Sequence, residues 1–174
     1  MDLYRTLLDV IDMRSFSNLW YWIALAVLWS STSHWILGVP FDMIQRARRQ
    51  GGQAALDVET MVAINCRRML NITRNAAVPL FFGLAFVLST LTALAFWYWV
   101  EFAQAVFCLV APLVPVGWLS LRAALRIEAG EDAGEALYRR LMTHRRQVQL
   151  VGMLAIFVTA MFGMYRNMSE SILG

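Results

Sequence analysis

The 174-residue sequence contains no lysine, so all fifteen of its basic side chains are arginine. We attribute this bias to codon usage, and the absence alone excludes no function. Charged residues are also scarce, at 16% of the chain against 59% hydrophobic residues. A soluble domain of this length has too little core volume to bury so much apolar surface. The composition therefore argues against a soluble globular protein.

Cysteine and the common catalytic motifs are missing or rare. Cys66 and Cys108 lie in different segments, with no CxxC or Cys/His spacing typical of metal sites. Neither a structural disulfide nor an iron–sulfur scaffold is expected from them. The sequence also lacks a phosphate-binding P-loop, a GxSxG motif and an HExxH motif. We predict no catalytic residues, no metal site and no cofactor, and an enzyme is the less favoured class.

The sequence does contain four runs of about twenty residues without Asp, Glu, Lys or Arg. They cover residues 19–39, 78–100, 102–121 and 148–165. About twenty helical residues cross the hydrocarbon layer of a bilayer, so each run is a candidate membrane span. Pro112 and Pro115 are expected to kink the third run, as membrane helices tolerate. The sequence predicts an all-α membrane protein: a four-helix bundle in one domain, residues 1–174, with peripheral amphipathic helices.

The arginines are distributed unevenly between the segments that connect these runs. Segments 40–77 and 122–147 carry twelve of them, whereas the remainder of the chain carries only Arg5, Arg14 and Arg166. The positive-inside rule then places both long loops in the cytoplasm and both termini outside, which for a bacterial inner membrane is the periplasm. Clustered arginines also attract acidic protein surfaces or anionic head groups. The candidate partner-docking residues are Arg46, Arg48, Arg49, Arg67, Arg68, Arg139, Arg140, Arg145 and Arg146.

Three amphipathic stretches flank the predicted spans. Residues 2–14 predict a short helix that lies in the outer interface or packs on a partner. After a break at Gly51 and Gly52, a second helix is expected to lead toward residue 78. Its predicted apolar face comprises Val58, Met61, Val62, Met69 and Ile72, with Cys66 beside it.

A third amphipathic helix is expected to follow Gly130. Asp132 and Glu135 resemble a capping arrangement for its free amides. An apolar stripe then leads into the fourth span, at Leu137, Leu141, His144 and Val148.

A polar run lies inside the first predicted span, at residues 30–34. Ser30 and His34 are one helical turn apart, so they could share a proton-handling, haem or metal site, which makes His34 the candidate cofactor-binding residue. The other interpretation is hydrogen bonding between helices near the cytoplasmic interface. We favour the second, because no other histidine lies at metal-ligand spacing from His34.

Three stretches of the chain look like parts of one known family. They are residues 11–23 (IDMRSFSNLWYWI), 35–42 (WILGVPFD) and 152–165 (GMLAIFVTAMFGMY). Together they resemble a bacterial family of small multi-span membrane proteins named "component of SufBCD complex". The resemblance implies an accessory protein that meets the iron–sulfur cluster assembly machinery through its cytoplasmic segments. It supplies no catalytic motif.

Two functions follow as expectations. The first is a non-catalytic accessory or scaffold protein of the inner membrane, associated with SufBCD. The alternative is the small membrane subunit of a transporter, or an accessory subunit of another membrane complex. The expected partners are the lipid bilayer and membrane or cytoplasmic proteins such as Suf subunits; a homo-oligomer is compatible with the sequence, and no nucleic-acid partner is expected.

Overall fold

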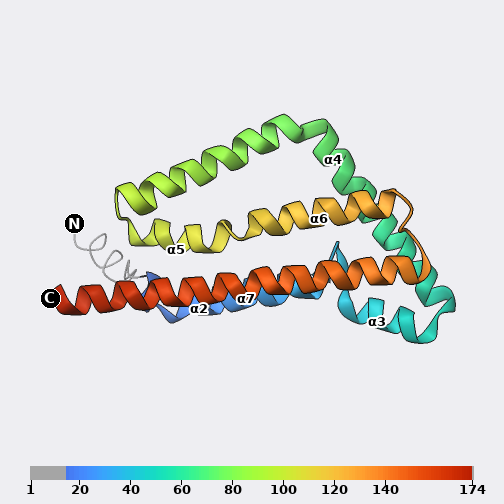
Figure 1. The fold of residues 1–174 in the computed structure, drawn as a ribbon, viewed down its shortest axis with the longest axis horizontal. Helices are drawn as coiled ribbons and strands as arrows, with labels where there is room; N and C mark the ends of the chain where they lie inside the picture. The colour runs from blue at the N-terminus through green and yellow to red at the C-terminus, as the bar shows by residue number, and fades with distance from the viewer. Residues whose placement is uncertain (1–14, 174) are drawn as a thin grey trace, which may run out of the picture.

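The computed structural model describes residues 15–173, which are helical apart from one short β-hairpin (Figure 1). The predicted interfacial helix at residues 2–14 lies outside the described residues. The elements in chain order are η1 (Ser15–Ser17), α2 (Leu19–His34), β1 (Trp35–Ile36), β2 (Val39–Pro40), α3 (Phe41–Gln50), α4 (Gly52–Thr92), η2 (Ala93–Trp97), α5 (Glu101–Val110), α6 (Leu113–Glu128) and α7 (Gly134–Leu173).

Three helical segments are long and apolar enough to cross a membrane: Gly52–Trp97, Glu101–Glu128 and Gly134–Met168. They confirm the all-α class and indicate membrane association. The first predicted span is helical only as far as His34, because Leu37 and Gly38 take positive φ angles of 50° and 77° and turn the chain into the β1–β2 hairpin. The expected helix end at residue 39 is therefore wrong, and α2 has 16 residues.

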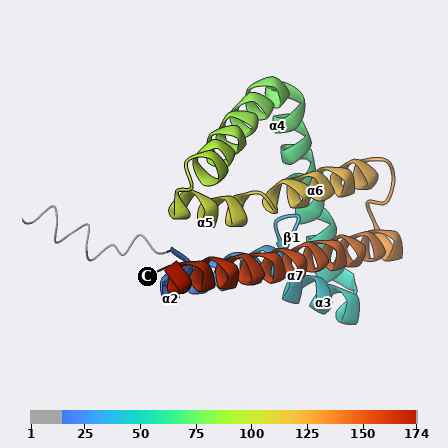
Figure 2. The same ribbon diagram turned by 60° about the vertical axis from the view of Figure 1, so that its left-hand side comes forward.

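The long helices lie side by side along one axis. α2 runs antiparallel to α7, with α5 and α6 alongside, so the start of α2 and the end of α7 lie at the same end of the molecule (Figures 1 and 2). Leu25 and Trp29 of α2 and Ala155 of α7 form the buried centre of this contact. Gly152 permits the close approach, because a Cβ there would lie 2.8 Å from the Trp29 ring.

Prolines interrupt two of the helices. Pro112 follows the end of α5 and precedes α6, as expected from the sequence. In α4, Pro79 lacks the N–H that would bond to residue 75, and its ring crowds that carbonyl. The chain bends at Ala76 (φ −123°, ψ 24°). The first half of α4 moves away from α6 up to this kink, and the second half runs back toward α5 (Figures 1 and 2).

The two arginine-rich segments fold together around a second hydrophobic core. α3, the first half of α4, the end of α6 and the start of α7 each contribute buried side chains to it. Along α4 the buried positions are Val58, Val62, Cys66 and Leu70, at intervals of four. The predicted face was wrong in part: Met61 and Ile72 are 40% and 47% exposed. Cys66 lies in the core and not beside it.

Candidate functional site

The arginine end, defined as residues 40–77 and 122–147, is the most strongly charged part of the molecule. It carries twelve arginines and seven carboxylates, a net charge of +5, whereas the rest of the chain has three arginines and five carboxylates. All of these arginines lie on α3, α4, α6 and α7, around the shared core. Because those helices pack on one another, the charges are held in fixed positions.

Glycines and one carboxylate set the boundaries of the helices at the arginine end. Gly51 ends α3 with φ 62°, and Gly130 begins the loop after α6 with φ 119°, which explains the predicted helix breaks. The prediction that Asp132 caps α7 is wrong, because a different carboxylate does so. The first amide of α7, at Gly134, instead donates to Oε1 of Glu59 on α4, at 2.9 Å. A carboxylate at this position also suits the positive end of the helix dipole.

Three ion pairs link the elements of the arginine end. Arg74 donates to both carboxylate oxygens of Glu128, at 3.1 and 2.6 Å, and so joins α4 to α6. Arg48 lies 3.7 Å from Glu135.

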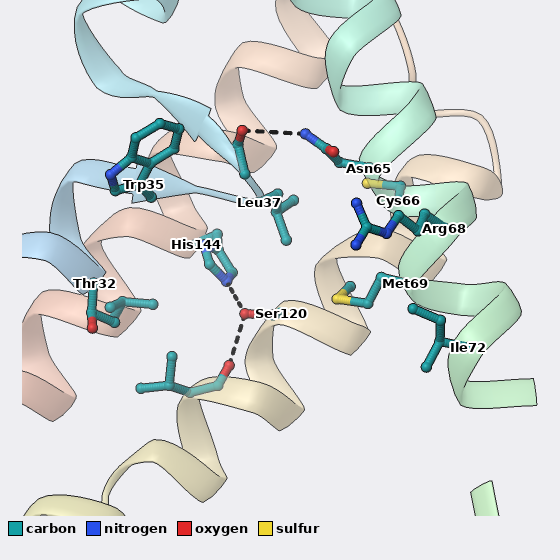
Figure 3. A pocket seen from close by; sticks show the side chains of 13 residues that line it. Thr32, Trp35, Leu37, Asn65, Cys66, Arg68, Met69, Ile72, Ser120 and His144 are labelled. Carbon is teal, nitrogen blue, oxygen red and sulfur yellow. Dashed lines mark hydrogen bonds between the residues drawn. The ribbon is translucent and has the colours of Figure 1, made fainter. Parts of the chain in front are cut away.

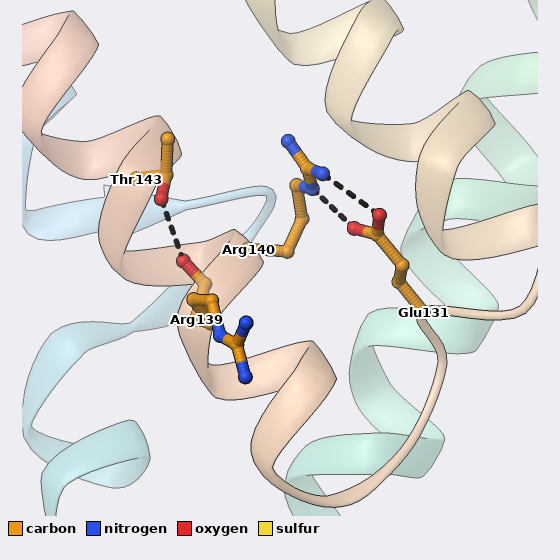
Figure 4. A network of polar contacts seen from close by, with 4 residues as sticks. All are labelled: Glu131, Arg139, Arg140 and Thr143. Carbon is orange, nitrogen blue, oxygen red and sulfur yellow. Dashed lines mark hydrogen bonds and ion pairs between the residues drawn. The ribbon is translucent and has the colours of Figure 1, made fainter.

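The third pair joins the α6–α7 loop to α7, where Arg140 donates through Nε and Nη2 to the two oxygens of Glu131 (Figure 4). These hydrogen bonds lower the pKa of Glu131, with a smaller contribution from the charges of Arg140, Arg126 and Arg139. Thr143 donates to the Arg139 carbonyl within α7 (Figure 4). The Arg139 guanidinium forms no hydrogen bond or ion pair with Glu131.

The predicted docking arginines fall into two groups. Arg48 and Arg140 form ion pairs, and the Arg145 guanidinium lies 3.4 Å above the ring of Phe41. The second group is exposed and forms no ion pair among residues 15–173. Its members are Arg46, Arg49, Arg67, Arg68, Arg139 and Arg146. These six present unneutralised positive charge at the surface.

No hydrogen bond joins the side chains of His34 and Ser30 among the described residues. His34 is exposed, and its Nε2 lies 3.8 Å from Oδ1 of Asp42 at the start of α3. The hydroxyls of Thr32 and Ser33 donate to carbonyls of their own helix, so the favoured interhelical hydrogen bonds are absent at these two positions. Among the described residues, no three His, Cys, Asp or Glu side chains lie close enough together to hold a metal ion.

A cavity of about 410 Å³ lies where the arginine end meets the long helices (Figure 3). This size falls within the usual range for small-molecule sites, roughly 300–1,000 Å³. Its walls come from α2, the β1–β2 hairpin, α4, α6 and α7. The lining residues are Thr32, Trp35, Leu37, Gly38, Asn65, Cys66, Arg68, Met69, Ile72, Val116, Ser120, His144 and Val148.

His144 is the most deeply buried polar residue of this wall, at 4% exposure. Its Nε2 lies 3.0 Å from Oγ of Ser120, and that hydroxyl also lies 2.9 Å from the Val116 carbonyl (Figure 3). Since a carbonyl can only accept, the serine donates to Val116 and accepts from the imidazole N–H. Nδ1 is buried without a hydrogen-bond partner among the described residues. The pair fixes the orientation of the imidazole on the wall of the cavity.

The sequence singled out His34 as a site residue and did not predict that a cavity forms. His144 had been placed in an apolar stripe, and the structure confirms that stripe: Leu137, Leu141, His144 and Val148 are all buried. A histidine on an otherwise apolar face was the available signal. No sequence signal relates it to Ser120, 24 residues earlier.

Comparison of the chain with protein-family models, with curated proteins and with solved structures gives no match. The arginine end and the adjoining cavity are therefore interpreted from their geometry.

Proposed function

We propose that this chain is a non-catalytic accessory protein of the bacterial inner membrane that docks an acidic cytoplasmic partner on its arginine end. The observation that carries the proposal is the set of six exposed, unpaired arginines on a folded core of four packed helices. A folded surface with an excess of positive charge binds an acidic surface without first ordering a loop, and it accelerates the encounter.

The orientation belongs to the same proposal. Both termini lie in the periplasm, and the arginine end faces the cytoplasm. α2 joins the three apolar segments described above in a four-helix membrane bundle. The charge distribution supports this orientation through the positive-inside rule. Alkaline phosphatase fused after residue 174 should be active, and a fluorescent cytoplasmic reporter at the same position would contradict the orientation.

The SufBCD assembly is the first partner to test, because the sequence resembles the family that carries its name. The chain is purified from native membranes in mild detergent, and co-purifying proteins are quantified by mass spectrometry. Suf subunits at levels near that of the bait support the proposal. Recovery of the bait alone, after mild solubilisation at low salt, contradicts a docking function.

Charge variants locate the docking surface. Arg46→Gln with Arg49→Gln removes two unpaired charges from α3. Losing two exposed ion pairs with the partner should lower the recovery of the partner by about fivefold. The matched control, Arg122→Gln with Arg126→Gln, removes the same charge from the end of α6, outside the candidate docking residues. Equal losses in both variants would indicate a general charge effect and refute a defined surface.

A transporter subunit is the second candidate function, and the second half of α4 favours it. None of the most apolar stretch of this helix is buried within the chain, and Phe81, Phe82 and Phe86 are each at least two-thirds exposed. A larger membrane subunit could cover this face. Recovery of a stoichiometric multi-span transport protein in the same purification would favour this function over the first.

A further inference from the structure

We propose that the cavity between α4, α6 and α7 is a binding site for one anionic phospholipid, with the headgroup phosphate held at Arg68. This inference concerns the cavity and does not require the docking function, although Arg68 also belongs to the proposed docking surface. It rests on the cavity's lining, on the unpaired guanidinium beside it, and on the divergence of the helices that form its walls.

The lining of the cavity is amphipathic. Met69, Ile72, Val116 and Val148 contribute apolar side chains from three helices. Arg68 and the amide of Asn65 lie on α4 before Met69, nearer the hairpin, where Asn65 donates to the Gly38 carbonyl at 3.2 Å (Figure 3). A ligand with an acyl chain and a polar anionic head matches both parts, whereas a fully polar ligand would leave the apolar wall uncovered.

Arg68 is available to such a headgroup. Its guanidinium extends from α4 toward Leu37 of the hairpin, along the cavity (Figure 3). It forms no ion pair or hydrogen bond among residues 15–173. An arginine at this place matches the planar oxygens of a phosphate through paired N–H donors. Basic pockets between helices at the cytoplasmic membrane surface are known lipid headgroup sites.

The kink in α4 gives a lipid a lateral route to the cavity. Ile72 and Val116 lie on α4 and α6, and α4 moves away from α6 as it approaches the kink at Ala76 (Figures 1 and 2). Beyond the kink the side chains of α4 are apolar and exposed, so in a membrane they lie in hydrocarbon. An acyl chain in the cavity can therefore extend from Ile72 toward this apolar half of α4, past the polar residues Thr73, Arg74 and Asn75.

Native mass spectrometry of the purified full chain tests the proposal with phosphatidylglycerol, phosphatidylcholine and inorganic phosphate as probes. One phosphatidylglycerol should bind at least about fivefold more tightly than phosphatidylcholine. Arg68→Gln should weaken phosphatidylglycerol binding by about tenfold. Arg67→Gln is the matched control, since it removes the same charge from the adjacent exposed position, which does not line the cavity.

A second variant tests the cavity without changing charge. Val116→Phe should fill the apolar part and weaken binding of both lipids, whereas Val114→Phe, on the same helix and outside the lining, should not. Equal effects of Arg67→Gln and Arg68→Gln, or undiminished binding to Val116→Phe, would overturn the site. Phosphatidylcholine binding as tight as phosphatidylglycerol would overturn the anionic selectivity. Displacement of the lipid by an equal concentration of inorganic phosphate would show that the site binds free phosphate and would overturn a lipid as its ligand.

Discussion

Truncating Leu141 tests whether the two arginine-rich segments share one packed core. Leu141 of α7 is fully buried, and it clusters with side chains of α3, α4 and α6. Replacing a buried leucine by alanine removes apolar contacts and leaves a cavity, at a cost of about 2–5 kcal/mol. Because partners from three other helices surround this side chain and limit its collapse, we expect Leu141→Ala to destabilise the arginine end by about 3 kcal/mol.

The thiol of Cys66 reports the opening of the same core. It is 4% exposed there, so a thiol-reactive dye too large for the cavity that Cys66 lines reaches it only when the core opens. Cys108, the other free thiol, is replaced by serine for this measurement. When the core recloses faster than it is labelled, the labelling rate follows the open population. A loss of about 3 kcal/mol then accelerates labelling by about 150-fold.

Leu56→Ala is the matched control for this experiment. Leu56 lies on α4 at the same end of the molecule, but its side chain is 56% exposed. A surface truncation of this kind changes stability by less than about 0.5 kcal/mol, so labelling should change by about twofold or less. If Leu141→Ala accelerates labelling no more than Leu56→Ala does, the shared core is wrong.

Two further perturbations test other contacts. Gly152→Ala places a Cβ 2.8 Å from the Trp29 ring and should lower stability by about 1–3 kcal/mol. In the control Gly117→Ala the new Cβ meets no atom within 4 Å, so this variant should be neutral or stabilising. Melting temperatures in detergent compare the two variants. Because its pKa is lowered in the fold, Glu131 stabilises the protein fully above the ordinary carboxyl pKa of about 4.3, and this contribution is lost as pH falls through the lowered folded value. The acid unfolding of Arg140→Gln should lack this pH-dependent contribution of Glu131. An acid-unfolding curve identical to that of the unaltered protein would rule out the coupling between Glu131 and Arg140.

Local features of the sequence predicted much of the helical framework. The stripe from Leu137 to Val148 repeats at helical spacing, and its burial follows from that period alone. Gly51, Gly130 and Pro112 act on their own backbone, so the breaks they cause are readable without the fold. The apolar face of α4 was partly misread, because Met61 and Ile72 match the helical period but are exposed.

Contacts between distant segments could not be read in this way. Glu59 caps α7 from 75 residues away, and its partner depends on how α4 crosses the start of that helix. The same holds for Ser120 and His144, which meet only because α6 packs on α7. The early end of α2 depends on the hairpin at Leu37, where a non-glycine residue takes a positive φ that composition does not predict.

The ordered core at the arginine end bears on what the arginines are for. The positive-inside rule acts on arginines in connecting segments whether or not those segments fold. Topology alone therefore gives no reason to order these segments, which costs about 1–2 kcal/mol of backbone entropy per residue. A docking surface does give one, since preordered side chains lose less freedom on binding. Leu141→Ala separates the two roles, because it loosens the core and keeps all twelve arginines. If the arginines serve docking, this variant keeps its membrane orientation and loses its partner; if they serve topology alone, partner recovery does not change.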